Sequence, residues 1–259
     1  MAAASNQPAI APLLPHGELQ SLFDNIWFIQ GQVKLPMRIP AKFSRSMTVH
    51  KNPINGELNL INSMRLSEQG LEELQKLGPI RNIIRLGGFH GRDDLFYQRH
   101  FKARVFAIQG QSYSRSLETL ANADDGYMKP DVWVSQASHL PIKNCKLKIF
   151  SSSTPPEAAM LIEEHDGVLV TAGSLQNTPK PDKYVNFPMK IIMRKFGLWT
   201  PYNVGPGWIK LAKPRAGDIR SILEYKFDHV LPGHGEAVIS NAKIKYNPIV
   251  STRIKGCHE

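Results

Sequence analysis

The sequence predicts one α/β domain with two similar halves. Three observations favour it: strand-like segments dominate the first part of the chain, strands then alternate with helices, and a second β-rich stretch precedes two more helices. No linker-like stretch divides the 259 residues, and no repeat of solenoid period is visible. We therefore expect residues 21–259 to form a single domain, preceded by a flexible arm over residues 1–20.

Three strands are predicted at the start of the domain by β-branched or alternating apolar residues: Ile26–Val33, Ser46–His50 and Glu57–Asn62. Asn55-Gly56 favours a tight turn between the second and the third. In Ser67–Leu77 the leucines recur at helical spacing and the first residue is a suitable N-cap, which predicts a short helix. The chain therefore begins as a β-meander and then changes to alternating strands and helices.

The rest of the chain continues with short apolar runs between turn residues. The predicted strands are Ile80–Leu86, Ala103–Ile108, Val132–Ser135, Lys146–Phe150, Ala158–Glu163, Gly167–Ala172 and Phe227–Leu231. The predicted helices are Arg115–Ala121, Phe187–Phe196 and Arg215–Tyr225. Two β-rich stretches with accompanying helices suit a layered α/β domain.

The composition is that of a globular protein with an excess of basic residues. The formal net charge is +10 and the pI is about 9.6, which suit an anionic partner. The basic residues are scattered, however, and the densest group is only Lys190, Arg194 and Lys195, so a nucleic-acid surface is not expected. No apolar run approaches the roughly 18 residues of a membrane span.

The cysteine content and the start of the chain indicate the compartment. Cys145 and Cys257 are too few for a disulfide framework and belong to no paired-cysteine metal motif. The first residues lack the basic and apolar regions of a secretory signal. We therefore expect a cytoplasmic protein.

The most specific motif is Pro232-Gly233-His234-Gly235, which directly follows the predicted strand Phe227–Leu231. Glycines on both sides of a histidine let the backbone turn sharply and bring the imidazole to a site at the strand's end. The motif resembles the late histidine loop of metallo-β-lactamase-fold hydrolases, in which this imidazole is a metal ligand. The resemblance covers roughly residues 24–243 and implies an αββα four-layer sandwich.

Two further segments resemble metal-binding motifs of that family but lack the ligand. Val168–Leu175 is similar to the strand and turn that supply a bridging aspartate, and Gly173 stands in the place of that aspartate. Phe150–Glu157 is similar to the segment that supplies a histidine, and Ser153 stands in its place. The resemblance therefore implies a degenerate metal site, as in a poorly characterised branch of the superfamily with incomplete metal motifs.

A third segment, Ile83–Asp94, lies where the family has His-x-His-x-Asp-His. In that alignment Gly88 replaces the first histidine, His90 keeps the second, Arg92 replaces the aspartate and Asp93 replaces the last histidine. We expect His90 and His234 to lie at the same edge of the sandwich.

The remaining residues could still hold a single divalent metal. Hydrolases of the family use one or two metal ions to lower the pKa of bound water and to polarise a carbonyl or phosphoryl group. If His90 and His234 face each other, Asp93 or Asp94 would complete a two-histidine, one-carboxylate set suited to zinc, iron or manganese. Asp93 and His234 are then the candidate catalytic residues. The alternative is that no cofactor is bound.

Arg92 favours the metal-free alternative. A guanidinium is permanently charged and cannot ligate a metal, but it could replace the positive charge of the ion and bind an anionic group of a substrate. The structural alternative is an ion pair with Asp93, Asp94 or Glu236 that holds two loops together.

The segment Phe196–Trp208 is rich in aromatic residues, glycine and proline. In the family this insertion often overhangs the site, so Trp199, Tyr202 and Trp208 are candidate pocket walls for a flat or apolar ligand. The alternative is an aromatic cluster that closes a small core under a long loop.

Two functional hypotheses follow. The first is a divergent metal-dependent hydrolase with a reduced metal centre. The second is a metal-free pseudoenzyme, or a binding protein, that uses the same cleft to hold an anionic or aromatic small molecule. The resemblance supports the fold and leaves the choice between the two open, because function depends on the site rather than on the scaffold.

Overall fold

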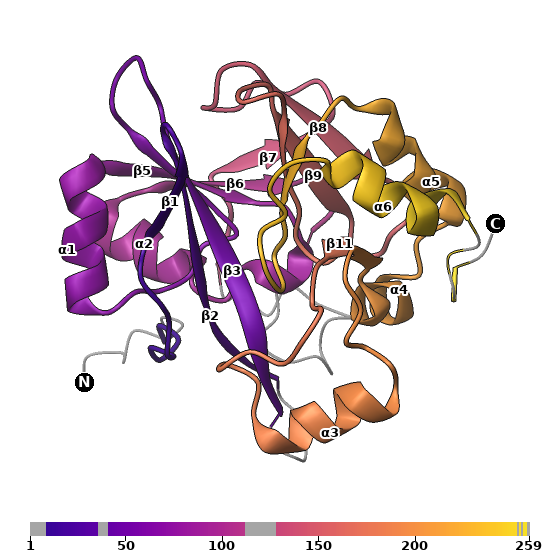
Figure 1. Cartoon of the computed structure of the whole chain (residues 1–259). Helices are drawn as coiled ribbons and strands as arrows, with labels where there is room; N and C mark the ends of the chain where they lie inside the picture. The colour runs from indigo at the N-terminus through magenta and orange to yellow at the C-terminus, as the bar shows by residue number, and fades with distance from the viewer. Residues whose placement is uncertain (1–8, 36–40, 112–127, 253, 255, 258–259) are drawn as a thin grey trace, which may run out of the picture.

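The computed structural model describes residues 9–35, 41–111, 128–252, 254 and 256–257. Two β-sheets face each other, and helices cover the outer face of each sheet, so the chain forms four layers (Figure 1). This arrangement confirms the αββα sandwich predicted from the sequence.

The larger sheet contains seven strands in chain order: β1 (Gln20–Phe23), β2 (Ile26–Leu35), β3 (Ala41–Lys51), β4 (Leu58–Ile61), β5 (Ile80–Arg85), β6 (Arg104–Ile108) and β7 (Val132–Val134). Neighbours from β1 to β4 are antiparallel, and those from β4 to β7 are parallel. Parallel neighbours need crossovers, and two of these contain α1 (Glu68–Leu77) and α2 (Asp94–Phe101), which cover the outer face (Figure 1). Ser67 caps α1 as predicted, since its hydroxyl accepts a 3.2 Å hydrogen bond from the Gly70 amide.

The smaller sheet has the strand order β13-β10-β9-β8, formed by His229–Leu231, Val168–Val170, Glu157–Ile162 and Cys145–Phe150. Its outer face is covered by α4 (Pro206–Ala212), α5 (Ala216–Arg220), the 3₁₀ turn η2 (Ser221–Glu224) and α6 (Ala242–Ser251). A short ladder joins β11 (Leu175–Gln176) to β12 (Asn203–Val204). Helix α3 (Phe187–Lys195) stands apart from these layers, at the bottom of Figure 1.

Three hydrophobic clusters fill the three gaps between the layers. Successive strand residues point to opposite faces, so Ile83 packs with the residues under α1 and α2, whereas Ile84 packs between the sheets. In the smaller sheet Leu169 faces the outer helices, while Val168 and Val170 face the other sheet. Burial on both faces is the reason why these strands appear in the sequence as continuous apolar runs.

Two helix predictions and two helices that were not predicted need comment. The predicted helix Arg115–Ala121 lies outside the described residues. The predicted helix Arg215–Tyr225 is divided into α5 and η2. Helix α6 was not predicted, and neither was α4, whose proline and glycine are typical of a loop, although Pro206 occupies the first turn of α4, where proline is well tolerated.

The structure corrects part of the predicted flexible arm. Residues 9–19 lie against the larger sheet: the Gln32 amide donates to the Pro15 carbonyl at 2.8 Å, and the Gly17 amide donates to the Gln30 carbonyl at 2.8 Å. His16 Nε2 accepts a 2.7 Å hydrogen bond from the amide of Ser67. Backbone pairing of this kind was not detectable in a stretch interrupted by Pro12, Pro15 and Gly17.

Among the residues described, no helix combines the length and the apolarity that crossing a bilayer requires.

Candidate functional site

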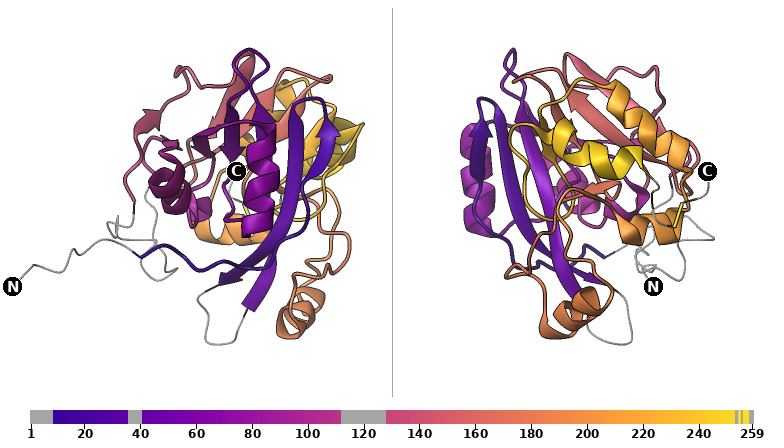
Figure 2. Two further views of the ribbon diagram at one scale, coloured as in Figure 1. Left: turned by 90° about the vertical axis from the view of Figure 1, so that its left-hand side faces the viewer. Right: turned by 45° about the vertical axis from the view of Figure 1, so that its right-hand side comes forward.

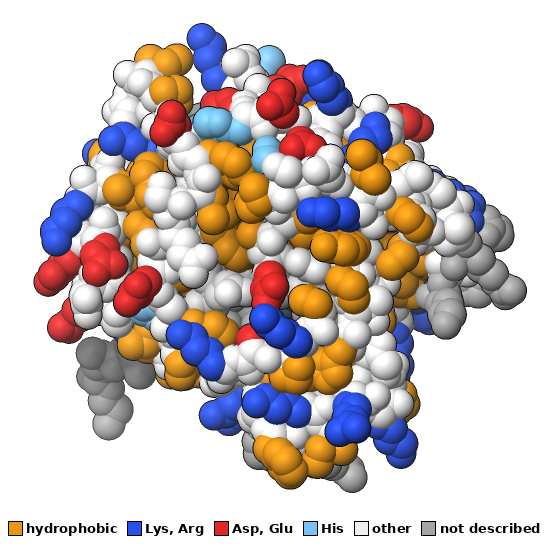
Figure 3. Space-filling view, in the orientation of Figure 1, with side chains coloured by type: hydrophobic (Ala, Val, Ile, Leu, Met, Phe, Trp, Pro, Cys, Tyr) orange, Lys and Arg blue, Asp and Glu red, His pale blue; other side chains and the backbone are white. Residues whose placement is uncertain are grey.

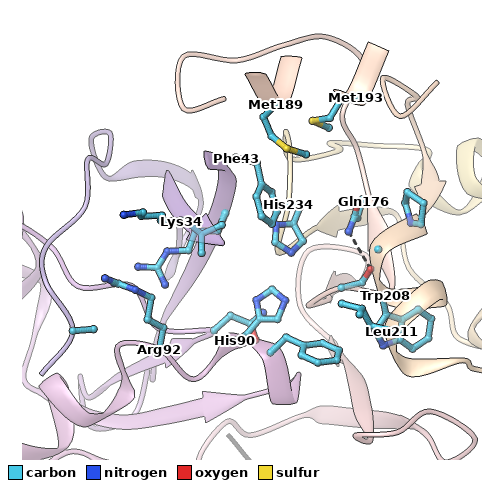
Figure 4. A pocket seen from close by; sticks show the side chains of 18 of the residues that line it. Lys34, Phe43, His90, Arg92, Gln176, Met189, Met193, Trp208, Leu211 and His234 are labelled. Carbon is cyan, nitrogen blue, oxygen red and sulfur yellow. Dashed lines mark hydrogen bonds between the residues drawn. The ribbon is translucent and has the colours of Figure 1, made fainter. Parts of the chain in front are cut away.

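A cavity of about 520 Å³ lies at the edge where the two sheets meet the loops after β5 and β13. Figure 4 shows Lys34 and Arg92 on one side of it, Trp208 and Leu211 on the other, and His90 and His234 between them. Most of the lining is apolar; these residues are Ala9, Ile10, Ala11, Pro12, Val33, Phe43, Phe89, Met189, Met193, Leu198, Pro206, Trp208 and Leu211. A concave apolar site with a few polar groups is the usual form of a small-molecule site.

The two glycines of the histidine loop are required by close backbone contacts. A Cβ on Gly235, whose φ is +90°, would meet the Asn177 carbonyl oxygen at 1.9 Å, and a Cβ on Gly233 would meet the Ala172 carbonyl oxygen at 2.5 Å. The loop is fixed to β3, because the Ser46 amide donates to the Gly233 carbonyl at 2.9 Å. The sequence motif therefore has the structural role predicted for it, and it delivers His234 to the cavity.

His90 and His234 lie together, as expected. Their ring centroids are 5.0 Å apart and their planes are tilted by 53°. The ring of Phe43 lies on the other side of His234, also at 5.0 Å. His90 ends the short 3₁₀ helix η1 (Gly88–His90), which directly follows β5. The two sheets thus each contribute one imidazole to the same edge.

Both imidazoles are neutral at physiological pH. Burial lowers the pKa of His234 to about 4, although a hydrogen bond to the Ser44 carbonyl partly opposes the effect and the Arg45 charge adds to it. Burial, His234 and Arg45 also lower the pKa of His90. A carbonyl can only accept, so His234 Nδ1 donates the 2.8 Å hydrogen bond to Ser44 and its Nε2 keeps a lone pair.

Asp93 does not join the histidines. Its buried carboxylate is held by Arg45, by Arg92 at 2.7 Å and by the Arg65 amide at 3.0 Å. A carboxylate with three such partners is committed to an ion-pair network. Asp93 is therefore placed as a structural anion rather than as a ligand beside His90.

Asp94 is also occupied elsewhere. It accepts a 2.6 Å hydrogen bond from the Ser63 hydroxyl and lies 3.8 Å from Arg85. Its burial raises the pKa of its carboxyl, against the opposing effect of Arg85. The expected two-histidine, one-carboxylate set is therefore not assembled by either aspartate.

The residues present do not fit the metal centre that the fold family implies. Across the described part of the chain, no group of three or more His, Cys, Asp or Glu side chains has the arrangement to hold a metal ion. Ser153, at one replaced position, is buried and donates to the Phe150 carbonyl at 2.9 Å while accepting from the Glu157 amide at 3.2 Å, which makes it part of a turn. The described residues therefore do not support a reaction that depends on a bound metal ion.

Glu157 is the residue that sequence reasoning missed. Its carboxylate comes from the start of β9, accepts a 2.6 Å hydrogen bond from the Ser174 amide through Oε1, and is fully enclosed. Oε2 has no hydrogen-bond partner among the described residues. Burial raises the pKa of this carboxyl to about 7, although the hydrogen bonds at residues 173 and 174 favour the charged form.

Two glycines make room for the Glu157 carboxylate beneath the cavity. A Cβ on Gly173 would lie 3.1 Å from Glu157 Oε2, and a Cβ on Gly87 would lie 2.9 Å from it and 3.1 Å from His90 Cδ2. The carboxylate therefore occupies the space beside the residue that replaces the family's aspartate. A glutamate that follows two prolines in sequence, with small residues at the facing turn, was the only signal available.

Restoring the family's aspartate at Gly173 is expected to destabilise the protein by about 2 kcal/mol, because the new side chain would be overpacked against Glu157 and Trp208 and would place a second carboxylate beside the first. Denaturant unfolding at neutral pH measures the change. Gly207→Asp is the matched control, since a Cβ there meets nothing within 4 Å. Adding Glu157→Gln should recover part of the loss, and an additive double variant would contradict the proposed contact.

Arg92 makes the ion pair that was the alternative to anion binding. It lies 2.7 Å from Asp93 Oδ1 and donates to the Pro12 carbonyl at 2.7 Å. Together with Arg65, which donates to the Ala11 carbonyl at 2.9 Å, it holds the N-terminal segment as one wall of the cavity. Arg92 also lines the cavity itself, so the two alternatives are compatible.

The three aromatic candidates are placed differently. Trp208, on α4, lines the cavity, and its buried Nε1 has no hydrogen-bond partner among the described residues. Tyr202 packs against Tyr246 in the outer core, with ring centroids 5.8 Å apart, and does not line the cavity. Trp199 is also outside the lining. The insertion thus provides both a pocket wall and an aromatic cluster.

No protein-family model matches the sequence, and a search of curated proteins by sequence finds no match. The fold, by contrast, matches many solved structures. The metallo-β-lactamase FIM-1 from Pseudomonas aeruginosa, in a mono-zinc form, is 8% identical with a TM-score of 0.58, over 92% of this chain and 96% of that one. A metallo-β-lactamase from Erythrobacter litoralis is 9% identical with a TM-score of 0.59, over 90% and 95% of the two chains.

A flavo di-iron protein variant from Thermotoga maritima is also similar, at 14% identity and a TM-score of 0.54, over 92% of this chain and 63% of that one. At such identities the likeness concerns the course of the backbone and carries no information on activity.

Proposed function

We propose that this chain, which has the metallo-β-lactamase fold, uses its cleft without a metal to bind a small amphipathic molecule that carries an anionic group. The cavity volume of about 520 Å³ is in the range of sites for drug-sized molecules. The proposal concerns the same cleft that houses the metal in the family, with a different set of polar groups.

Two buried donors on the cavity lining carry the proposal. Arg45 Nε and Trp208 Nε1 have no hydrogen-bond partner among the described residues. Buried N–H groups in native proteins are nearly always paired, so each needs an acceptor atom from a ligand or from a water molecule that a ligand displaces. Arg45 lies on β3 of the larger sheet and Trp208 on α4, which covers the smaller sheet, so one molecule bound in the cavity could contact both.

The charges on the lining favour an anion. The charged residues that line the cavity are Lys34, Arg45 and Arg92, and the two histidines are neutral. The lining includes no carboxylate among the described residues, and the raised pKa of Glu157 leaves that group largely protonated below pH 7. Lys34 and Arg92 lie on one side of the cavity, Trp208 and Leu211 of α4 lie on the other, and Met189 and Met193 of α3 lie at the top of the view (Figure 4). An acidic head group and an apolar body match this division.

The test compares the binding of a carboxylate with the binding of the uncharged alcohol of the same chain length. Isothermal titration with dodecanoate and with dodecanol should give tighter binding of the acid, and Arg92→Met should reduce the affinity for the acid by about tenfold while leaving the alcohol nearly unchanged. Met193→Trp, which fills the apolar end, should weaken both ligands. Circular dichroism of each variant confirms that it is folded.

Two outcomes would contradict the proposal. Equal affinity for acid and alcohol in the wild-type protein would remove the role of the cations. Near-stoichiometric zinc, iron or manganese in the purified protein, lost in His234→Ala, would revive the hydrolase hypothesis, for which the paired imidazoles at 5.0 Å are the supporting observation.

A further inference from the structure

Helix α3 projects from the body of the molecule. In Figures 1 and 2 it lies at the bottom of each view, outside the four layers. Its N-cap residue is tied to β3, since the Lys42 amide donates to Asn186 Oδ1 at 3.1 Å and the Asn186 amide donates to the Lys42 carbonyl at 3.2 Å. Met189 and Met193, one helical turn apart, face the cavity. This face of α3 therefore points toward the cavity and the body of the molecule.

The opposite face of α3 exposes large apolar side chains. Phe187 is 74% exposed and Ile191 is 52% exposed, and their i, i+4 spacing places them on one stripe. Phe196, directly after the helix, is 67% exposed, but at 100° per residue it falls on the other side of the helix from Phe187. Elsewhere on the described surface no more than two exposed large apolar residues occur within ten positions, as at Ile239 and Ile244.

Basic side chains flank this apolar stripe. At 100° per residue, Arg194 falls on one side of Phe187 and Ile191, and Lys195 falls on the other; both are exposed. Lys190 is half-buried and adjacent, and residues 187–196 contain no acidic residue. Figure 3 shows hydrophobic and basic side chains together over α3.

We propose that this surface, formed by Phe187, Lys190, Ile191, Arg194 and Lys195, docks on an anionic lipid bilayer. Apolar side chains inserted at the level of the head groups, with cations beside them, are the arrangement by which an interfacial helix binds such a surface. A second copy of the chain would oppose the same basic residues on two molecules that each carry a net charge of +10, which disfavours self-association here. Nucleic acid would pair with the cations but would leave the exposed Phe187 and Ile191 in water.

Sedimentation with vesicles tests the proposal. The full-length protein should sediment with phosphatidylcholine vesicles that contain phosphatidylserine and not with pure phosphatidylcholine, and added salt should weaken the binding. Phe187→Ser combined with Ile191→Ser should reduce binding at least about tenfold, as should Arg194→Glu combined with Lys195→Glu.

Matched controls exist for both variants. Ile54→Ser combined with Ile244→Ser removes two side chains that are each 71% exposed elsewhere, and Lys76→Glu combined with Arg81→Glu makes the same change in net charge at exposed positions of α1 and β5. Both controls should bind vesicles as the wild type does.

Three results would overturn the proposal. One is the absence of sedimentation with anionic vesicles. Another is equal loss in the α3 variants and in their controls, which would indicate only a general effect of charge or apolar area. The last is capture of an RNA oligonucleotide that depends on Arg194 and Lys195 but not on Phe187 and Ile191, with no vesicle binding, because it would identify a nucleic-acid surface.

Discussion

Glu157→Gln is expected to raise the free energy of unfolding at about pH 8 by about 3 kcal/mol relative to the wild type, and to change it little at about pH 5. The folded-state pKa of Glu157 is about 7, whereas the ordinary value is 4.5. Between these values the folded protein keeps a proton that the unfolded chain has released. The contribution of Glu157 to the free energy of unfolding of the wild type therefore falls as pH rises from about 4.5 to 7 and is constant above pH 7.

Glutamine is the suitable replacement because it mimics the protonated acid. Its carbonyl can still accept the hydrogen bond from the Ser174 amide, and its amide nitrogen takes the place of Oε2, which has no partner among the described residues. Urea unfolding of both proteins across this pH range measures the difference. The contributions of His90 and His234, whose lowered pKa values act in the opposite sense below about 6.5, are common to both proteins and cancel.

A variant whose stability parallels that of the wild type at every pH would contradict the raised pKa of Glu157. It would also remove the argument that the Glu157 carboxyl next to Gly173 is largely uncharged below pH 7, and with it one of the supports for an anionic ligand.

Arg45→Met is expected to destabilise the protein by at least about 3 kcal/mol, because it leaves the buried Asp93 carboxylate short of its closest cation. Arg92 and the Arg65 amide remain as partners, which keeps the loss at the lower end of the range for a broken buried ion pair. Denaturant unfolding at neutral pH gives the value. Arg81→Met, at an exposed position of β5, is the control and should change stability by less than about 0.5 kcal/mol.

The second step of this test is a double variant. If the cost of Arg45→Met comes from the uncompensated charge, adding Asp93→Asn should recover more than half of it. If the two changes are additive, the pair is not energetically coupled, and Asp93 would again become available as a functional carboxylate beside His90.

The sequence predicted which loops form the site more reliably than it predicted how the charged side chains there are paired. Pro232-Gly233-His234-Gly235 was interpretable because both glycines are required locally: the close contacts with Ala172 and Asn177 exclude any Cβ. The meeting of His90 and His234 was expected from the resemblance to the metallo-β-lactamase family, in which both histidine segments lie at the same edge of the sandwich. The partners of Asp93 did not follow, because Arg45 precedes a predicted strand by one residue and its charge would ordinarily suggest exposure.

The aromatic insertion illustrates the same division. Trp208 was predicted as a pocket wall and lines the cavity, whereas Tyr202 turned inward against Tyr246. That difference depends on α4, which begins at Pro206 and aims Trp208 back toward the sheets. A helix of seven residues that starts Pro-Gly has too few positions for its periodicity to be recognised in the sequence.

By itself, the sequence predicted strands, helices and the histidine loop, because periodicity and glycine requirements are local properties that can be recognised along the chain, and its resemblance to the metallo-β-lactamase family implied the four layers and the replaced metal-ligand positions. Only the tertiary structure decided that Asp93 and Asp94 are occupied by arginines, that Glu157 lies beneath Gly173, and that α3 exposes a basic, apolar face. These outcomes depend on which side chains from distant segments reach the same space, and on how much water remains around them. Neither quantity is contained in the order of residues within any one segment.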